Sequence, residues 1–233
     1  MKLDPRMRSR NVHDRRGLRG GRAAAGGGGL LVAGLIVASF IFPDELRPVL
    51  QILGVDGPGG AASQQQAAPI DDEINAFVSI TLGYTEDFWS DAFASGAVTG
   101  ESAPYQPATV VLFTGSARSQ CGAASAQTGP FYCPADQSIY IDPDFYDVMA
   151  TQLRSPGDFA QAYVIAHEVA HHVQNLAGVL RQVHQAKVRS NDPVMGNRLT
   201  VRLELQADCF AGVWARRTDE KHQILEQGDL GEA

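Results

Sequence analysis

The stretch YVIAHEVAHHVQNL, residues 163–176, contains three of the six histidines of this 233-residue chain. Its apolar residues recur at helical spacing, with Ile165 and Val169 on one face. His167 and His171 are four residues apart, so they share another face of the same helix. The stretch therefore predicts a helix that packs through one side and presents two imidazoles on the other.

The two histidines and the intervening glutamate form an HExxH motif, in which both imidazoles can bind one Zn²⁺. Glu168 projects beside them and is suited to take a proton from a water that the metal activates. Gln174 and Ala177 exclude the extended HExxHxxGxxH zinc site, which needs glycine and histidine at those positions. We therefore expect His167 and His171 as zinc ligands and Glu168 as the catalytic residue, with a third ligand elsewhere.

A second helical stretch, VRLELQADCFAGVW (residues 201–214), offers the third ligand. Glu204 and Asp208 share one helix face, where Glu204 can bind the metal and Asp208 can accept the remaining ring N–H of a ligand histidine. Ala207 and Ala211 would let this helix approach the first one closely. The alternative is that both carboxylates are solvated charges. However, the large apolar residues around them predict a largely buried helix, where unpaired carboxylates are costly.

Four other polar residues have candidate roles. His172 turns about 100° away from His171 around the helix, so we interpret it as a structural, hydrogen-bonded histidine, with a catalytic role as the alternative. His184, Tyr163 and His222 are candidates for stabilising an oxyanion. The ligand set favours one Zn²⁺ per chain over cobalt or manganese.

The N-terminal region predicts a membrane anchor. Residues 1–22 contain eight basic and two acidic residues, and residues 23–42, AAAGGGGLLVAGLIVASFIF, carry no charge. Twenty helical residues span about 30 Å, the thickness of the hydrocarbon core of a bilayer. We expect a basic cytoplasmic head (1–22) and one retained transmembrane helix (23–42) in the bacterial cell membrane, with the rest periplasmic or extracellular. A cleaved signal peptide and a soluble core helix are the alternatives.

The remaining sequence predicts one folded domain. Residues 43–70 are rich in glycine, alanine, glutamine and proline, which is typical of a flexible linker, so residues 71–233 form the domain. Helical patterns flank two short strands, ATVVLFTG (108–115) and SIYID (138–142). The fold class is therefore α+β, a mainly helical domain with a small β-region. We expect SIYID to be an edge strand that can pair with an extended peptide.

The cysteines and the charge agree with a domain outside the cytoplasm. Cys121 and Cys133 enclose a loop without periodic pattern and are expected to form a disulfide in an oxidising compartment; two reduced thiols are the alternative. Cys209 lies in a helical pattern and is expected to be a buried, inert thiol. Without residues 1–22 the chain holds 11 basic and 24 acidic residues, a net charge of −13 that disfavours nucleic-acid binding.

Five stretches carry a family resemblance: NVHDRRG, LGYTEDFWS, CGAASAQTGPFYCPADQSIYID, GDFAQAYVIAHEVAHHVQN and VRLELQADCFAGVWA. Together they resemble the bacterial family of neutral zinc metallopeptidases with a single N-terminal membrane segment. The resemblance implies a zincin-like domain with a gluzincin-like site, in which His167, His171 and Glu204 bind zinc and Glu168 is the general base. It does not supply a substrate.

We therefore expect a membrane-anchored, zinc-dependent endopeptidase that hydrolyses a peptide or protein substrate. The alternatives are a catalytically inactive, zinc-stabilised envelope scaffold and a binding protein whose motif is accidental. The scaffold alternative rests on the end of the chain, where Asp229 and Glu232 form a capping box that only one residue follows. Members of the family continue further, so we expect a truncated C-terminus. Nothing in the sequence indicates an oligomeric state.

Overall fold

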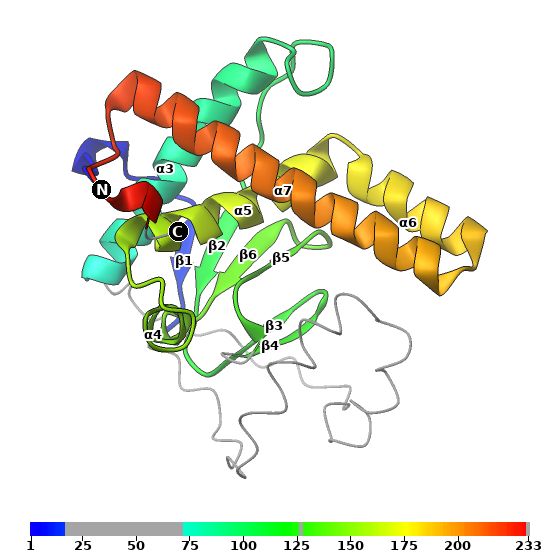
Figure 1. The fold of residues 1–233 in the computed structure, drawn as a ribbon, viewed down its shortest axis with the longest axis horizontal. Helices are drawn as coiled ribbons and strands as arrows, with labels where there is room; N and C mark the ends of the chain where they lie inside the picture. The colour runs from blue at the N-terminus through cyan, green and yellow to red at the C-terminus, as the bar shows by residue number, and fades with distance from the viewer. Residues whose placement is uncertain (17–71, 126–127, 232–233) are drawn as a thin grey trace.

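The structure is a computed structural model that describes residues 1–16, 72–125 and 128–231. Three helices, α3, α5 and α7, gather on one side of a small sheet (Figure 1). The described helices are η1 (Pro5–Met7), α3 (Glu73–Ala94), α4 (Asp144–Thr151), α5 (Asp158–Leu176), α6 (Val179–Ser190), α7 (Pro193–His222) and η3 (Asp229–Gly231). The described strands are β1 (Val12–Asp14), β2 (Thr109–Leu112), β3 (Ser116–Ser119), β4 (Gly122–Ser125), β5 (Phe131–Cys133) and β6 (Ser138–Ile141). The mixture of helices and a small sheet that the sequence predicts is confirmed.

The main sheet has the order β1-β2-β6-β5, and β3 and β4 form a separate antiparallel hairpin. β1, β2 and β6 run parallel, whereas β5 is antiparallel to β6. The expectation that SIYID forms an edge strand is therefore wrong, because β6 is paired on both sides. Its four residues are all buried, as expected for a strand that is covered on both faces. β5 is the edge of the sheet instead.

Residues 1–16 are part of the folded domain, which corrects the predicted boundaries of head and domain. β1 pairs with β2, with Val12 opposite Val110, and the Ser9 backbone N–H donates to the Ser79 carbonyl at 2.9 Å. η1 packs so closely on α3 that a Cβ atom at Gly83 would lie 1.5 Å from the Met7 carbonyl oxygen. Periodicity could not reveal this packing, because β1 has only three residues and its partner lies almost 100 residues further along the chain.

Residues on either side of the undescribed range 17–71 share one ion cluster. The Arg16 guanidinium pairs with Asp14 and, at 2.9 Å, with Asp72, which caps the start of α3. Asn75 of α3 also donates to Asp14. The predicted anchor (23–42) and the predicted linker lie outside the described residues. Within the part of the chain that the structure describes, no helix combines the length and the apolar character that a membrane crossing needs.

The helices continue further than the sequence patterns indicate. α3 is one helix rather than two, and Thr85 lies inside it with its hydroxyl bonded to the Leu82 carbonyl, although a threonine followed by acidic residues is typical of a helix start. α7 extends at both ends of the predicted segment, and α6 was not predicted.

Small residues bring α5 and α7 into close contact. Ala162 and Ala166 of α5 and Ala207 and Ala211 of α7 are at most 1% exposed. Both α7 alanines were expected at this contact. Cys209, in contrast, is exposed, so the expectation of a buried thiol is wrong. It follows Ala207 by two residues, which turns it about 200° around the helix, away from the packed face.

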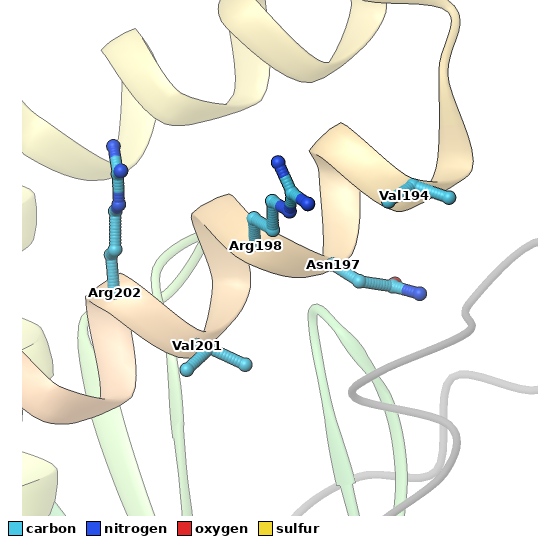
Figure 2. Close-up of a pocket in the computed structure, with 5 residues that line it drawn as sticks. All are labelled: Val194, Asn197, Arg198, Val201 and Arg202. Atoms are coloured by element: carbon cyan, nitrogen blue, oxygen red, sulfur yellow. The ribbon is translucent and has the colours of Figure 1, made fainter.

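The outer face of α7 is open to solvent, so the expectation of a largely buried helix holds for one face only. Val201 and Leu205 are 48% and 61% exposed, whereas Trp214 is 1% exposed. A shallow pocket of about 420 Å³ lies along the first turns of α7, where Val201 and Arg202 project from opposite sides of the helix (Figure 2).

The Cys121–Cys133 disulfide that the sequence predicts is present. It connects the turn between β3 and β4 to the last residue of β5. The hairpin, whose Ala124 packs in a cluster with Val111 and Tyr140 of the main sheet, is thus also tied covalently to the edge strand. The disulfide also holds the C-terminal end of β5, a strand that contacts α5.

Candidate metal centre

Helices α5 and α7 bring three potential ligand atoms together. His167 and His171 lie one turn apart on α5, and Glu204 lies on the adjoining face of α7. The two Nε2 atoms are 3.1 Å apart, and each lies 3.3 Å from Oε2 of Glu204. Among the described residues, this is the group of histidine, cysteine and acidic side chains that could hold a metal ion. It is the set that the sequence predicts.

The spacing of these atoms fits zinc. Ligands at 2.0–2.1 Å from a tetrahedral Zn²⁺ lie about 3.3 Å from one another. The three observed separations, 3.1, 3.3 and 3.3 Å, match that value before any side chain moves. Two imidazoles and one carboxylate also form a ligand set of catalytic zinc sites, which leave the fourth position open.

The Nδ1 atom of each ring has a hydrogen-bond acceptor, which orients the ring with Nε2 toward the centre. Nδ1 of His167 lies 2.9 Å from Oδ1 of Asp208, and Nδ1 of His171 lies 2.9 Å from Oε1 of Gln174. Since both partners accept, both Nδ1 atoms carry the ring proton in the neutral form. Both Nε2 atoms then direct lone pairs at each other and at the Glu204 carboxylate. Three acceptors at this distance need a cation or added protons between them.

The pKa values reflect this demand for positive charge. Burial lowers the pKa of His171. Its hydrogen bond to Glu204 and the charges of Glu168 and Glu204 have the larger, opposite effect and raise the pKa to about 9. The pKa of His167 is raised by the same balance between burial and Glu204. Burial raises the pKa of Glu204, whereas hydrogen bonds from the two histidines lower it, to about 2. The pKa values of both histidines are thus shifted in the direction that favours positive charge beside Glu204.

Glu168 has the environment of a group that exchanges protons. Its side chain is buried, with the residue 8% exposed, and lies between the two histidines in the sequence. Burial raises its pKa, and the charges of His171 and His167 only partly oppose this effect. The backbone N–H of Tyr132 in β5 also acts on this carboxyl group and lowers its pKa slightly. A carboxyl group with a raised pKa can accept a proton and pass it on near neutral pH.

A series of hydrogen bonds through His172 and Asn175 connects α5 to the edge strand β5. His172 is fully buried, and its Nε2 donates to the Gln106 carbonyl at 2.6 Å. Its Nδ1 therefore accepts from the Tyr132 hydroxyl at 3.0 Å, and that hydroxyl accepts from Asn175 at 2.9 Å. Burial lowers the pKa of His172, so the ring stays neutral. These contacts agree with the structural role expected for His172.

Comparison with known proteins identifies the family. The profile of a family described as "Putative neutral zinc metallopeptidase" matches residues 1–233. The chain belongs to this family. "Uncharacterized protein YpfJ" of Escherichia coli K12 is 41% identical over 245 residues, which cover 100% of this chain and 80% of the relative. "Uncharacterized protein Rv2575" of Mycobacterium tuberculosis H37Rv is 42% identical over 179 residues, 70% of this chain and 57% of the relative. No solved structure matches the chain.

The three oxyanion candidates of this family member lie in different places. Tyr163 is closest to the centre, because its hydroxyl donates to the Asp208 carbonyl at 3.0 Å. His222 pairs with Asp87 at 2.8 Å, and it follows Asp208 by 14 residues, roughly 20 Å along α7. His184 is an exposed residue of α6. The structure therefore brings only Tyr163 of the three into contact with a site residue among the described contacts.

Three residues in and around the candidate metal centre had no assigned role in the sequence: Gln174, Tyr132 and Asn175. Gln174 follows His171 by three residues, and side chains at this helical spacing are neighbours. That spacing could have pointed to the contact. Tyr132 had no such signal, because it reaches α5 from a different part of the chain.

Proposed function

We propose that the protein is a zinc-dependent endopeptidase that hydrolyses peptide bonds. One observation carries the proposal: three converging acceptor atoms, His167 Nε2, His171 Nε2 and Glu204 Oε2, lie beside the buried carboxyl group of Glu168. Membership of the family supports a metallopeptidase role in general. Ligands that converge with zinc spacing, next to an acid–base group, are what metal-assisted hydrolysis requires.

Each residue of the site has a separate task. His167, His171 and Glu204 would hold zinc, which when bound supplies Lewis-acid activation of water and of the scissile carbonyl. An Oε atom of Glu168 takes the proton from the attacking water and later gives it to the leaving amine nitrogen. Asp208 holds the His167 ring with Nε2 facing the centre.

The edge of β5 is the place where we expect an extended peptide to bind. β5 replaces SIYID in this role, because β6 has no open edge. The backbone of Tyr132 in β5 is near enough to Glu168 to lower its pKa, so a peptide that pairs with this strand would pass the site. An uncleaved peptide bound to a Glu168→Gln variant should slow amide hydrogen exchange in β5. Equal slowing in β1, at the opposite edge of the sheet, would contradict this placement.

The proposal is tested by metal content and cleavage in the same samples. The purified full chain should hold about one zinc per chain and cleave members of a peptide library. Glu168→Gln should keep the zinc and lose cleavage by at least about 100-fold, since general acid–base groups contribute this much. His167→Ala should lose both. Zinc-loaded wild type without cleavage of any peptide would instead support the zinc-stabilised scaffold.

We also propose that the domain works outside the cytoplasm, with residues 1–16 on the same side. The disulfide supports an oxidising compartment, and a strand shared between residues 1–16 and the sheet requires both to fold together. A single crossing of the bilayer between them would place residues 1–16 and the rest of the domain on opposite sides of the membrane. We therefore propose this arrangement in place of the expected cytoplasmic head. Attachment to the membrane through residues 23–42 stays a proposal.

Cysteine labelling in intact cells can test this topology. Arg10→Cys and Gln152→Cys both introduce an exposed thiol, the first in the N-terminal segment and the second in the domain. In a Cys209→Ser background, a membrane-impermeant thiol reagent should label both variants equally. Labelling of Gln152→Cys without labelling of Arg10→Cys would refute the shared compartment.

A further inference from the structure

Gln174 is a buried amide that bridges the two helices of the metal centre. Its side chain lies on α5 and is completely buried. Its Oε1 is 2.9 Å from Nδ1 of His171, and its Nε2 is 2.8 Å from the Leu203 carbonyl oxygen and 3.1 Å from Oε1 of Gln206. One side chain thus contacts a candidate zinc ligand on α5 and two groups on α7.

The orientation of this amide follows from its partners. A backbone carbonyl can only accept, so the group that faces Leu203 must be the NH₂ end. The carbonyl end of Gln174 then faces His171 and accepts the proton on Nδ1. The Leu203 backbone therefore determines, through a single amide, that Nε2 of His171 carries the lone pair directed at the centre.

The bridge also links the position of His171 to that of Glu204. Leu203 is the residue immediately before Glu204 on α7, and it is the Leu203 carbonyl that holds the amide. A shift of α7 along α5 would therefore break this hydrogen bond and also move the third ligand. The two helices are held in register at the point where their ligands meet.

The chemistry of the surroundings accounts for an amide at this position. Asp208, which plays the same part for His167, has a side chain 52% exposed to water. Gln174 has no such exposure, and Glu168 and Glu204 already place two carboxyl groups near His171. A third, buried carboxylate would add like-charge repulsion and a large desolvation cost. A neutral amide accepts the same proton without either penalty.

We propose that Gln174 is a positioning residue for zinc: it fixes the tautomer and the ring orientation of His171 and holds α5 in register with Glu204 on α7. The inference rests on the proposed function, because it assigns a task within the same site. Residues that orient zinc ligands in this way typically contribute 10- to 100-fold to metal affinity.

Zinc affinity, measured by competition with a chromophoric chelator, tests the proposal without any peptidase assay. Gln174→Met, of similar size but without the amide, should weaken zinc binding 10- to 100-fold. Gln206→Met removes another partner of the same amide but leaves His171 bonded, so it should stay within about twofold of wild type. Wild-type affinity in Gln174→Met would overturn the proposal, as would equal losses in the two variants.

A third variant separates the ring contact from the helix bridge. Gln174→Glu in its ionised form keeps an acceptor for Nδ1 of His171 but cannot donate to Leu203. It should bind zinc more tightly than Gln174→Met, because the orienting hydrogen bond is retained. Equal affinities in these two variants would assign the effect to packing of the helices and overturn the role at His171.

Nuclear magnetic resonance of the wild-type full chain needs no substitution. The Nδ1–H proton of His171 should be observable and slow to exchange with water, because it is hydrogen-bonded inside the protein. Fast exchange at this position would overturn the proposal even if a Gln174 variant failed to fold. Wild type that binds no zinc but shows the protected proton would refute the proposed function and leave the orientation by Gln174 intact.

Discussion

Zinc binding to the metal-free protein should release protons, because the ligand histidines hold protons in the absence of metal. The pKa of His171 is raised to about 9, so at pH 7 about 99% of these rings are protonated. Coordination through Nε2 requires that proton to leave. The pKa of His167 is also raised above its ordinary value of 6.5, so this ring releases a further part of a proton. Together the two histidines should release more than one proton per zinc at pH 7.

The same shift predicts how zinc affinity depends on pH. A raised pKa favours the protonated ring below pH 9, so zinc binding weakens as the pH falls through this range. From His171 alone, zinc affinity should fall about 50-fold between pH 9, where about half of the rings are deprotonated, and pH 7, where about 1% are. Glu204, with a pKa lowered to about 2, is already ionised at pH 7 and should contribute no proton.

Isothermal titration calorimetry in two buffers of different ionisation enthalpy counts these protons directly. Glu204→Gln is the informative variant, because the hydrogen bond to Glu204 is the largest effect that raises the pKa of His171. It should release fewer protons at pH 7 than wild type does. Release of less than about half a proton by wild type would refute the reasoning, since it would mean that the rings do not converge on the carboxylate as described.

Three substitutions test the packing, each by urea denaturation. Gly83→Ala should lower the free energy of unfolding by about 2–3 kcal/mol, because its Cβ would lie 1.5 Å from the Met7 carbonyl oxygen. A loss below about 0.5 kcal/mol would contradict the packing of residues 1–16 on α3. Gly212→Ala should instead raise it by about 1 kcal/mol, because nothing lies within 4 Å of its Cβ and alanine favours the helix; a decrease would contradict the open surface there. Replacing Cys121 and Cys133 by serine should lower it by about 3 kcal/mol, given a sequence separation of 12, and an unchanged value would show that the disulfide does not constrain the unfolded chain.

The sequence alone predicts the features of the site that depend on spacing within one helix. Residues four apart on a helix are neighbours whatever surrounds them, so His167 and His171 had to share a face, as did Glu204 and Asp208. Small residues such as Ala207 likewise predict a close contact with another helix, but they do not indicate which helix that is. Local geometry carries this information because the repeat of the helix is the same in every protein.

Contacts between distant segments were decided by the tertiary structure. The partner of β1, the edge position of β5 and the exposure of Cys209 depend on which surfaces meet, and no local period encodes that choice. Gln174 shows the same limit within the site. Its distance from His171 follows from the sequence, but its donation to Leu203 exists only because α5 and α7 pack together. The sequence by itself thus determined which residues could bind a metal, and only the packing of the two helices decided how those residues are held.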